Sequence, residues 1–372
     1  MSTPARRALL PTALLALVTV LVGCSSADPG PASSPPAPSP TDITSAAPTP
    51  TDSPAPSTAP DAEPTGPTEP PAPAEPQEAL PPVDNRTSLA TLMRERPDGA
   101  RPRILRTIET TDAFIRYAVT YRSGETTVSG VLLRPRGDGP FPGIVLNHGY
   151  IEPSIYVTGQ GLAREQVALA TDGFVVLHTD YRGHAAGDPP GGVERESRLG
   201  YTRDAVNAVD ALEKLPYVDP DRMAMLGRSM GGGITMGALV AQPGLVDAAV
   251  IYASVSSDFR DNLRQFTEPG RPAAANDLYR RFGTPQESPG FYDALSTRTY
   301  FDRITEPVLS LHGSVDATCP PQWARDTQRA MKRAGVDSTL QFYEGEDHAF
   351  YDRWQDSMDR SIRFIRQQFR AA

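Results

Sequence analysis

The chain has 372 residues, a formal net charge of -9, 39 prolines, two cysteines and five histidines. That length is sufficient for one large domain or two of ordinary size, each with a buried core. The acidic balance argues against a nucleic-acid partner, because such partners are bound by neutralising their phosphates with Lys and Arg. Two cysteines exclude a disulfide scaffold, and no Cys/His spacing is typical of a metal site, so we expect no metal.

Residues 1–23 have the composition of a signal peptide. Two arginines precede an apolar run from Ala8 to Val22, which is too short to span a bilayer as a permanent helix. The run ends in Leu21-Val22-Gly23-Cys24 and resembles the signal of bacterial lipoproteins, whose cysteine is lipidated and becomes the mature N-terminus. The resemblance implies an extracytoplasmic protein anchored to the bacterial cell membrane through Cys24. An ordinary secretory signal with an incidental cysteine is the alternative.

Residues 24–82 are rich in Pro, Ala, Ser and Thr. They hold nineteen of the 39 prolines and contain no Lys, Arg, Phe, Tyr or Trp. Such a segment buries too little apolar surface to offset its conformational entropy, so the sequence predicts a disordered tether. The tether carries most of the acidity, which leaves residues 83–372 with a net charge of only -3. We therefore expect contact with a membrane through the lipid anchor alone.

Residues 83–372 alternate strand-like and helical patterns, which is typical of a mostly parallel sheet covered by helices on both faces. The runs 114–121 and 126–133 flank Ser123-Gly124 and predict an antiparallel hairpin. Six further apolar runs predict strands buried on both sides, namely 143–146, 174–177, 223–226, 248–252, 308–311 and 340–343. Apolar residues at helical spacing predict helices over 199–215, after Gly231 and over 354–369. The sequence therefore predicts one α/β domain with an eight-stranded sheet.

The third of these buried runs leads into Gly227-Arg228-Ser229-Met230-Gly231. A serine between two glycines, after a strand and before a helix, is typical of a nucleophile elbow. The glycines suit a tight turn in which the helix packs closely on the strand. The turn lifts the Ser229 hydroxyl clear of the sheet, near a helix N-terminus that favours negative charge. We predict that Ser229 is a catalytic nucleophile; a glycine-rich turn without catalysis is the alternative.

A serine hydroxyl needs a base to take its proton and an acid to orient that base. In the fold that carries this elbow, the chain order is nucleophile, acid, histidine. Only His312 and His348 follow Ser229, and only His348 has a suitable acid before it at a strand end, Asp316. We predict that His348 is the base and Asp316 the orienting acid, with Asp347 as the rival acid. His312 is expected to be structural.

The transition state also needs hydrogen-bond donors for an oxyanion. The amide of Met230, directly after the nucleophile, is the first expected donor. The loop after the run 143–146 reads Asn147-His148-Gly149-Tyr150, and a His-Gly pair there resembles the oxyanion loop of hydrolases. The resemblance implies the Tyr150 amide as the second donor, and we expect His148 to hold the loop in shape.

The motifs taken together resemble the α/β-hydrolase superfamily and, more narrowly, the catalytic domain of the prolyl oligopeptidase family of serine peptidases. They lie at 148–150, 180–184, 227–232, 311–316 and 347–350, within a resemblance that covers about residues 100–370. It implies a serine hydrolase that cleaves a peptide or ester bond in a small substrate, through an acyl-enzyme on Ser229. By the same resemblance Asp316 is the acid, His348 is the base and no cofactor is needed.

Two alternatives to a peptidase remain. Larger family members have an N-terminal propeller, which does not fit into residues 83–140, and this favours a carboxylesterase. The Ser-Met-Gly-Gly-Gly stretch also resembles secreted cutinase-like polyester hydrolases. A hydrolase scaffold that has lost activity and serves as a surface binding lipoprotein is the second alternative.

The connection between Ala253 and Pro307 is long and aromatic, and it predicts a small helical lid over about 255–305. Cys319 follows Asp316 by three residues and is predicted to be a buried, inert thiol.

Overall fold

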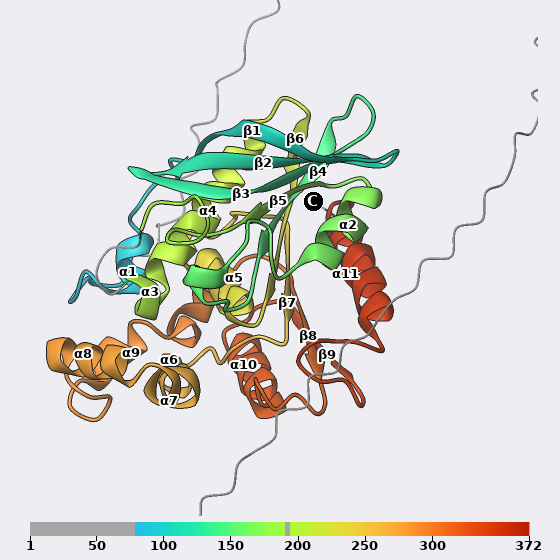
Figure 1. Ribbon diagram of the computed structural model, residues 1–372. Coiled ribbons are helices and arrows are strands. Elements are labelled where there is room, and N and C mark those ends of the chain that lie inside the picture. Colours follow the sequence, from blue (N-terminus) through green and yellow to red (C-terminus); the bar gives the residue numbers. More distant parts are fainter. Residues whose placement is uncertain (1–78, 190–193, 372) are drawn as a thin grey trace, which may run out of the picture. The chain divides into compact units, whose positions relative to one another are not determined.

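A computed structural model describes residues 79–189 and 194–371 of the chain (Figure 1). The predicted signal peptide, Cys24 and residues 24–78 of the predicted tether lie outside the described residues. The described residues belong to one unit, Ala74–Ala372. Within them, every helix is too short or too polar to cross a membrane.

A nine-stranded sheet runs through this unit in the order β1-β2-β3-β5-β4-β6-β7-β8-β9. The first three strands form an antiparallel meander joined antiparallel to β5, and all pairs from β5 to β9 are parallel. The strands are β1 (Ala100–Thr110), β2 (Phe114–Ser123), β3 (Thr126–Pro135), β4 (Phe141–Asn147), β5 (Val175–Thr179), β6 (Val218–Arg228), β7 (Ala248–Tyr252), β8 (Val308–Gly313) and β9 (Ser338–Tyr343).

The predicted count of eight strands is one too few. The additional strand is β1, an edge strand in which all residues except Pro102 are exposed. Because neither face of β1 is covered, its sequence carries no apolar run or alternation, the two patterns by which strands are recognised. The other eight strands overlap the predicted runs.

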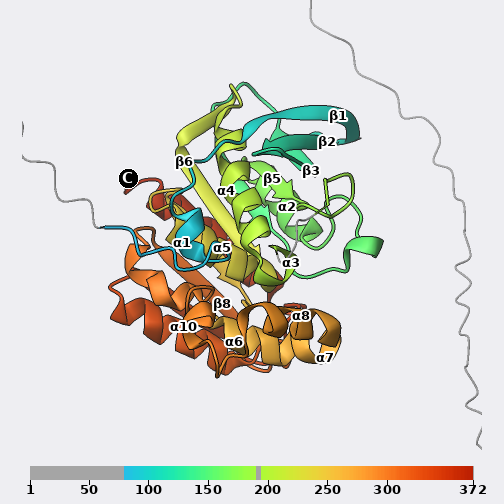
Figure 2. The same cartoon turned by 90° about the vertical axis from the view of Figure 1, so that its left-hand side faces the viewer.

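Helices cover both faces of the sheet (Figures 1 and 2). One face carries α2 (Ala163–Thr171) and α11 (Trp354–Gln368), and the other carries α4 (Leu199–Glu213), α5 (Met230–Ala241) and α10 (Pro321–Arg333). Short helices lie at α1 (Leu89–Leu92), η1 (Pro153–Ile155) and α3 (Glu194–Ser197).

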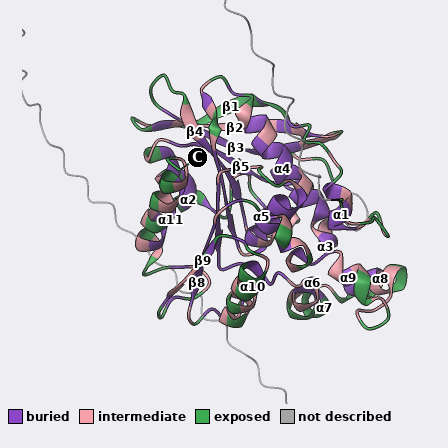
Figure 3. Cartoon of the chain, turned by 180° about the vertical axis from the view of Figure 1, so that it is seen from behind, coloured by how far each residue is buried: buried purple, intermediate pink, exposed green. Residues whose placement is uncertain are grey.

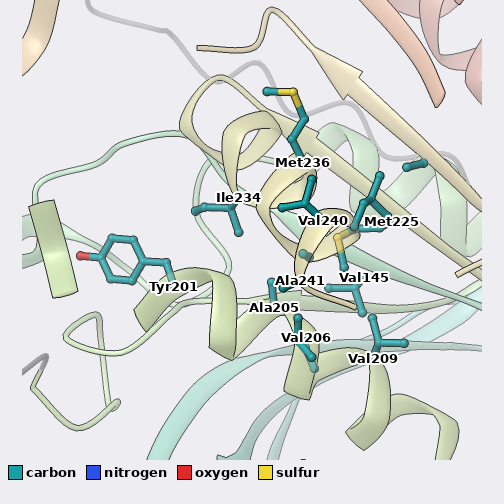
Figure 4. Packing of buried hydrophobic residues seen from close by; sticks show 14 of the residues in the cluster. Val145, Tyr201, Ala205, Val206, Val209, Met225, Ile234, Met236, Val240 and Ala241 are labelled. Atoms are coloured by element: carbon teal, nitrogen blue, oxygen red, sulfur yellow. The ribbon is translucent and has the colours of Figure 1, made fainter. Parts of the chain in front are cut away.

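Successive residues of a central strand therefore enter different cores. On β4, Ile144 and Leu146 pack with the α2 and α11 side, whereas Val145 packs with the α4 and α5 side. Figure 4 shows the second core, where Ile234 and Val240 of α5 lie among side chains of α4 and the strands. In Figure 3 the central strands are almost wholly buried while the outer helix surfaces are exposed. Burial on both faces explains why the predicted strands are unbroken apolar runs.

Short helices fill the connection between β7 and β8, where the lid was expected. They are α6 (Phe259–Asn262), the π-helix η2 (Leu263–Thr267), α7 (Glu268–Gly270), α8 (Pro272–Phe282), α9 (Pro289–Asp293) and the 3-10 helix η3 (Thr297–Arg303). Phe282 stacks on Phe291 with ring centroids 4.2 Å apart. Phe259 and Tyr292 are buried in the core shared with α4 and α5, so the insertion packs on the domain rather than standing apart from it.

Candidate active site

Ser229 occupies a tight turn between β6 and α5. Its backbone has φ 56° and ψ -120°, a conformation that a residue with a side chain adopts only at a cost in strain. A Cβ atom on Gly231 would lie 1.9 Å from the carbonyl oxygen of Asn147, and one on Gly227 would lie 2.2 Å from that of Gly231. Both flanking glycines are therefore required by close backbone approach, as the elbow motif predicts.

The loop after β4 lies directly against the nucleophile candidate. A Cβ atom on Gly149 would lie 3.2 Å from Ser229 Cβ and 3.7 Å from Ser229 Oγ. Tyr150 and Met230, the residues whose amides are the expected oxyanion donors, line the same cavity as Ser229. The Tyr150 hydroxyl donates to Glu152 Oε2 at 2.6 Å, so the phenol is engaged in this side-chain bond.

His348 and Asp316 meet at the carboxyl ends of β9 and β8. The imidazole Nδ1 lies 2.8 Å from Asp316 Oδ2, and the carboxylate is fully buried while the imidazole is 25% exposed. The amides of Thr318 and Cys319 donate to the other oxygen, Asp316 Oδ1, at 2.9 and 2.8 Å. The carboxylate is thus fixed by two backbone donors, and it orients the ring.

Asp347, the rival acid, is exposed and accepts a hydrogen bond from the Ala349 amide at 2.8 Å. With Nδ1 donating to Asp316, Nε2 of His348 is the nitrogen left to accept a proton. His348 and Ser229 line the same cavity, and among the described residues no hydrogen bond joins the hydroxyl to the imidazole.

His312 and Cys319 are buried beside the Asp316 carboxylate, with His312 Nε2 at 3.4 Å from Asp316 Oδ2. His312 is buried, its Nε2 donates to the Cys319 carbonyl at 2.8 Å, and burial lowers its pKa. Burial strongly raises the pKa of the Cys319 thiol, while a hydrogen bond with the Ser229 side chain acts in the opposite direction. The thiol is therefore protonated at neutral pH and adjoins the Ser229 hydroxyl, a neighbour that the sequence did not place.

Arg228 links the elbow to the loop that carries His348. Its Nη2 donates to Glu165 Oε1 at 2.6 Å, and its Nη1 donates to the Ala349 carbonyl at 3.0 Å. Trp354 Nε1 donates to the same Glu165 oxygen at 3.0 Å. Sequence reasoning missed this network, because Arg228 occupies a variable position of the elbow motif and Glu165 carries no local signal.

We expect Glu165→Gln to lower the free energy of unfolding by about 3 kcal/mol, because it leaves the Arg228 guanidinium buried without its counterion. Denaturant unfolding measures the change. Asp172→Asn, at the end of the same helix, removes a half-exposed partner of Arg366 and should cost less than about 1 kcal/mol. Equal losses of stability in the two variants would show that the buried pair of Glu165 and Arg228 contributes no more than the half-exposed pair of Asp172 and Arg366.

His148 holds the loop from inside, as expected. Its Nδ1 contacts the Gly149 carbonyl at 2.6 Å, and the ring stacks on Tyr156 with centroids 4.7 Å apart. Burial, and to a lesser extent the neighbouring His184, lower the pKa of His148 to about 4.

This pKa has a consequence for stability. Between pH 6.5 and 4 the unfolded chain binds a proton at His148 that the folded protein excludes, so stability falls as pH falls through that window. At pH 5 we expect His148 to contribute a loss on the order of 2 kcal/mol relative to pH 7, and His178, His184 and His312, whose pKa values burial also lowers, add to the loss in both proteins. Urea unfolding at both pH values should show a smaller loss in His148→Gln. An identical loss of stability in the variant would contradict the assignment of this pH dependence to His148. Burial raises the pKa of Asp180, so Asp180 stabilises the folded state as pH falls, in the wild-type protein and the variant alike.

A cavity of about 300 Å³ opens beside Ser229. It brings together the catalytic candidates, the loop after β4, the start of α4 and the helical insertion. Its lining residues are Tyr150, Arg195, Arg198, Tyr201, Ser229, Met230, Val255, Phe266, Arg271, Thr318 and His348. Because Phe266 and Arg271 come from the insertion, the predicted lid segment supplies one wall of this cavity.

This sheet, with a serine elbow, a histidine and a buried carboxylate at one edge, is the architecture of an α/β hydrolase. Residues 161–372 match the model of the Prolyl oligopeptidase family, so the chain belongs to that family and is a serine hydrolase.

The proteins that this chain resembles in sequence include peptidases. The uncharacterized peptidase YtmA of Bacillus subtilis (strain 168) is 27% identical over 242 residues, which cover 63% of this chain and 86% of that protein. Dipeptidyl peptidase 4 of Felis catus is 27% identical over 183 residues, covering 48% of this chain and only 22% of the relative.

Solved structures of both peptidases and esterases share the fold. An acetyl xylan esterase from Paenibacillus sp. R4 superimposes with a TM-score of 0.58 at 19% identity, covering 75% of this chain and 92% of the esterase. The acylaminoacyl peptidase of Pyrococcus horikoshii superimposes with a TM-score of 0.54 at 21% identity, covering 69% and 42%. Because the sequence identities are this low, the superpositions show only that the fold is shared.

Proposed function

We propose that this serine hydrolase cleaves a peptide or ester bond of a small substrate through an acyl-enzyme on Ser229. The observation that carries the proposal is the 2.8 Å bond between His348 Nδ1 and the buried Asp316 carboxylate, at the cavity that Ser229 also lines. A serine, an oriented imidazole and a buried acid at one cavity have the composition of a hydrolytic triad.

Each residue then has a defined step. Ser229 Oγ attacks the carbonyl carbon of the substrate while its proton passes to His348 Nε2. Asp316 stabilises the resulting imidazolium through Nδ1. The amides of Met230 and Tyr150 stabilise the negative charge on the carbonyl oxygen. His348 then protonates the leaving group, and a water molecule activated by the same imidazole releases the acid and restores Ser229.

A peptide substrate is supported by the peptidase names among the sequence relatives. A carboxylesterase is the alternative, supported by a cavity of about 300 Å³ whose size suits a short acyl group. The test is a rate series on p-nitrophenyl acyl esters and on aminoacyl and prolyl p-nitroanilides, with Ser229→Ala as the control. Amide turnover within about tenfold of ester turnover supports the peptidase, and turnover of esters alone supports the carboxylesterase. If neither class is turned over and a fluorophosphonate fails to label the folded protein, the scaffold is a binding protein.

We also propose that the enzyme is extracytoplasmic and anchored to the bacterial cell membrane by a lipid on Cys24, on a tether formed by residues 24–82. The support is the order of charged start, apolar run and Leu-Val-Gly-Cys in the sequence. We expect the wild-type chain in the membrane fraction of producing cells and Cys24→Ser largely outside it. Retention of the variant in that fraction would contradict the lipid anchor.

A further inference from the structure

The cavity beside Ser229 carries an excess of positive charge. Three arginines line it, and two of them have carboxylate partners just outside. Arg195 Nη2 lies 3.0 Å from Glu152 Oε2, and Arg271 Nη2 lies 2.8 Å from Glu196 Oε2. The third is Arg198, and no Asp or Glu stands among the described residues that line the cavity.

The side chain of Arg198 has no hydrogen bond or ion pair within 79–189 and 194–371, although it is partly buried. Its Nη1 lies 3.7 Å from the position of a Cβ atom on Gly233, one turn into the helix that follows Ser229. The guanidinium therefore lies beside the first turn of α5, and its side chain lines the cavity that Ser229 also lines. Burial, the largest effect, lowers the pKa of Arg198 to about 10, so the group is still charged at neutral pH.

The backbone of Arg198 indicates that this placement is specific. The residue precedes α4 with φ 63° and ψ 6°, in the left-handed region that a residue with a side chain seldom occupies. Such conformations cost about 1 kcal/mol or more and persist where the surroundings enforce them, often at ligand sites. A partly buried guanidinium that has no direct ion pair is a second cost, only partly offset by the nearby Glu196, and an anionic ligand would remove it.

We propose that Arg198 binds a free carboxylate of the substrate, so that the hydrolase prefers anionic substrates whose carboxylate lies within a few bonds of the scissile carbonyl. A planar guanidinium holds a carboxylate through two parallel hydrogen bonds. The proposal rests on the function proposed above and names its substrate class. The carboxylate belongs either to the acyl group, as in a half-ester of a dicarboxylic acid, or to the leaving group, as at the C-terminus of a short peptide.

Two matched substrate pairs separate these sources. The acyl-side pair is mono-p-nitrophenyl glutarate against p-nitrophenyl pentanoate, and the leaving-group pair is an N-acetylated dipeptide against its C-terminal amide. In the full-length wild-type protein we expect kcat/KM to favour the anionic member of one pair. In Arg198→Gln we expect that preference to fall by about 10- to 100-fold, the weight of a hydrogen bond to a charged group.

Two further variants sharpen the result. Arg198→Lys keeps the charge without the planar fork, and we expect it to restore part of the preference. Arg280→Gln removes an arginine that is 68% exposed on α8, and it should leave the preference unchanged.

Labelling of Ser229 by an uncharged fluorophosphonate separates the two proposals. If the wild-type protein is labelled but prefers the anionic member of neither pair, the proposed role of Arg198 is wrong and the proposed hydrolase function is unaffected. The same conclusion follows if Arg198→Gln and Arg198→Lys are labelled and keep the full preference. If the folded wild-type protein is not labelled, the proposed function fails and the substrate class fails with it.

Discussion

Replacing Ser229 with alanine is expected to lower kcat on the best p-nitrophenyl ester by about 10⁴- to 10⁶-fold. The variant lacks the oxygen that forms the acyl-enzyme, so only binding and oxyanion stabilisation remain to accelerate attack by water. Because alanine is smaller than serine and removes only a hydroxyl that adjoins the Cys319 thiol and lines the cavity, the fold should be retained. Steady-state kinetics give kcat, and thermal unfolding checks the fold.

Ser254 provides the matched control for this prediction. It lies next to the elbow, where a Cβ atom on Gly232 would contact it, but its hydroxyl donates to the Val255 carbonyl at 3.0 Å. Ser254→Ala should change kcat by less than about tenfold, the weight of one neutral hydrogen bond. A Ser229→Ala variant that keeps more than about a hundredth of the wild-type kcat would contradict a covalent mechanism at this residue.

Asp316→Asn is expected to lower kcat by about 10⁴-fold with little change in KM. Asparagine matches aspartate in shape, and its oxygen can still accept from the amides of Thr318 and Cys319. It cannot stabilise the imidazolium formed at His348 during proton transfer, and its NH₂ group facing Nδ1 favours the wrong tautomer. The loss should therefore fall on the chemical step.

Asp347→Asn tests the competing assignment in the same assay. This exposed carboxylate accepts a hydrogen bond from a backbone amide, and among the described residues the imidazole pairs with Asp316 instead, so kcat should change by less than about tenfold. A loss in Asp347→Asn as large as that in Asp316→Asn would show that the geometry at Asp316 does not define the orienting acid.

The central sheet and the elbow could be predicted because their physics is local. Burial on both faces makes β4 a continuous apolar run, since Ile144 and Val145 each face a core. Close backbone approach requires glycine at 227 and 231, so the motif identifies the turn even from a single sequence. The exposed β1 has neither signature, and for that reason the predicted sheet lacked one strand.

The parts that escaped prediction depend on contacts between distant segments. Arg228 and Glu165 are 63 positions apart, and nothing near either residue indicates the other. The same holds for the Cys319 thiol beside Ser229 and for Arg198 in the cavity wall. Chain order was sufficient to predict His348 and Asp316 as a pair, but only the fold shows which carboxylate lies within hydrogen-bond distance of the imidazole.

Trapping the acyl-enzyme is the most direct test of the central claim. Rapid mixing with a p-nitrophenyl ester should release a burst of about one p-nitrophenol per active site, followed by slower turnover. Quenching in acid and fragmenting the protein by mass spectrometry should then place the acyl group on Ser229. An acyl group found on another residue would contradict the mechanism. Turnover without a burst and without a covalent adduct, under conditions in which deacylation is slow, would also contradict it.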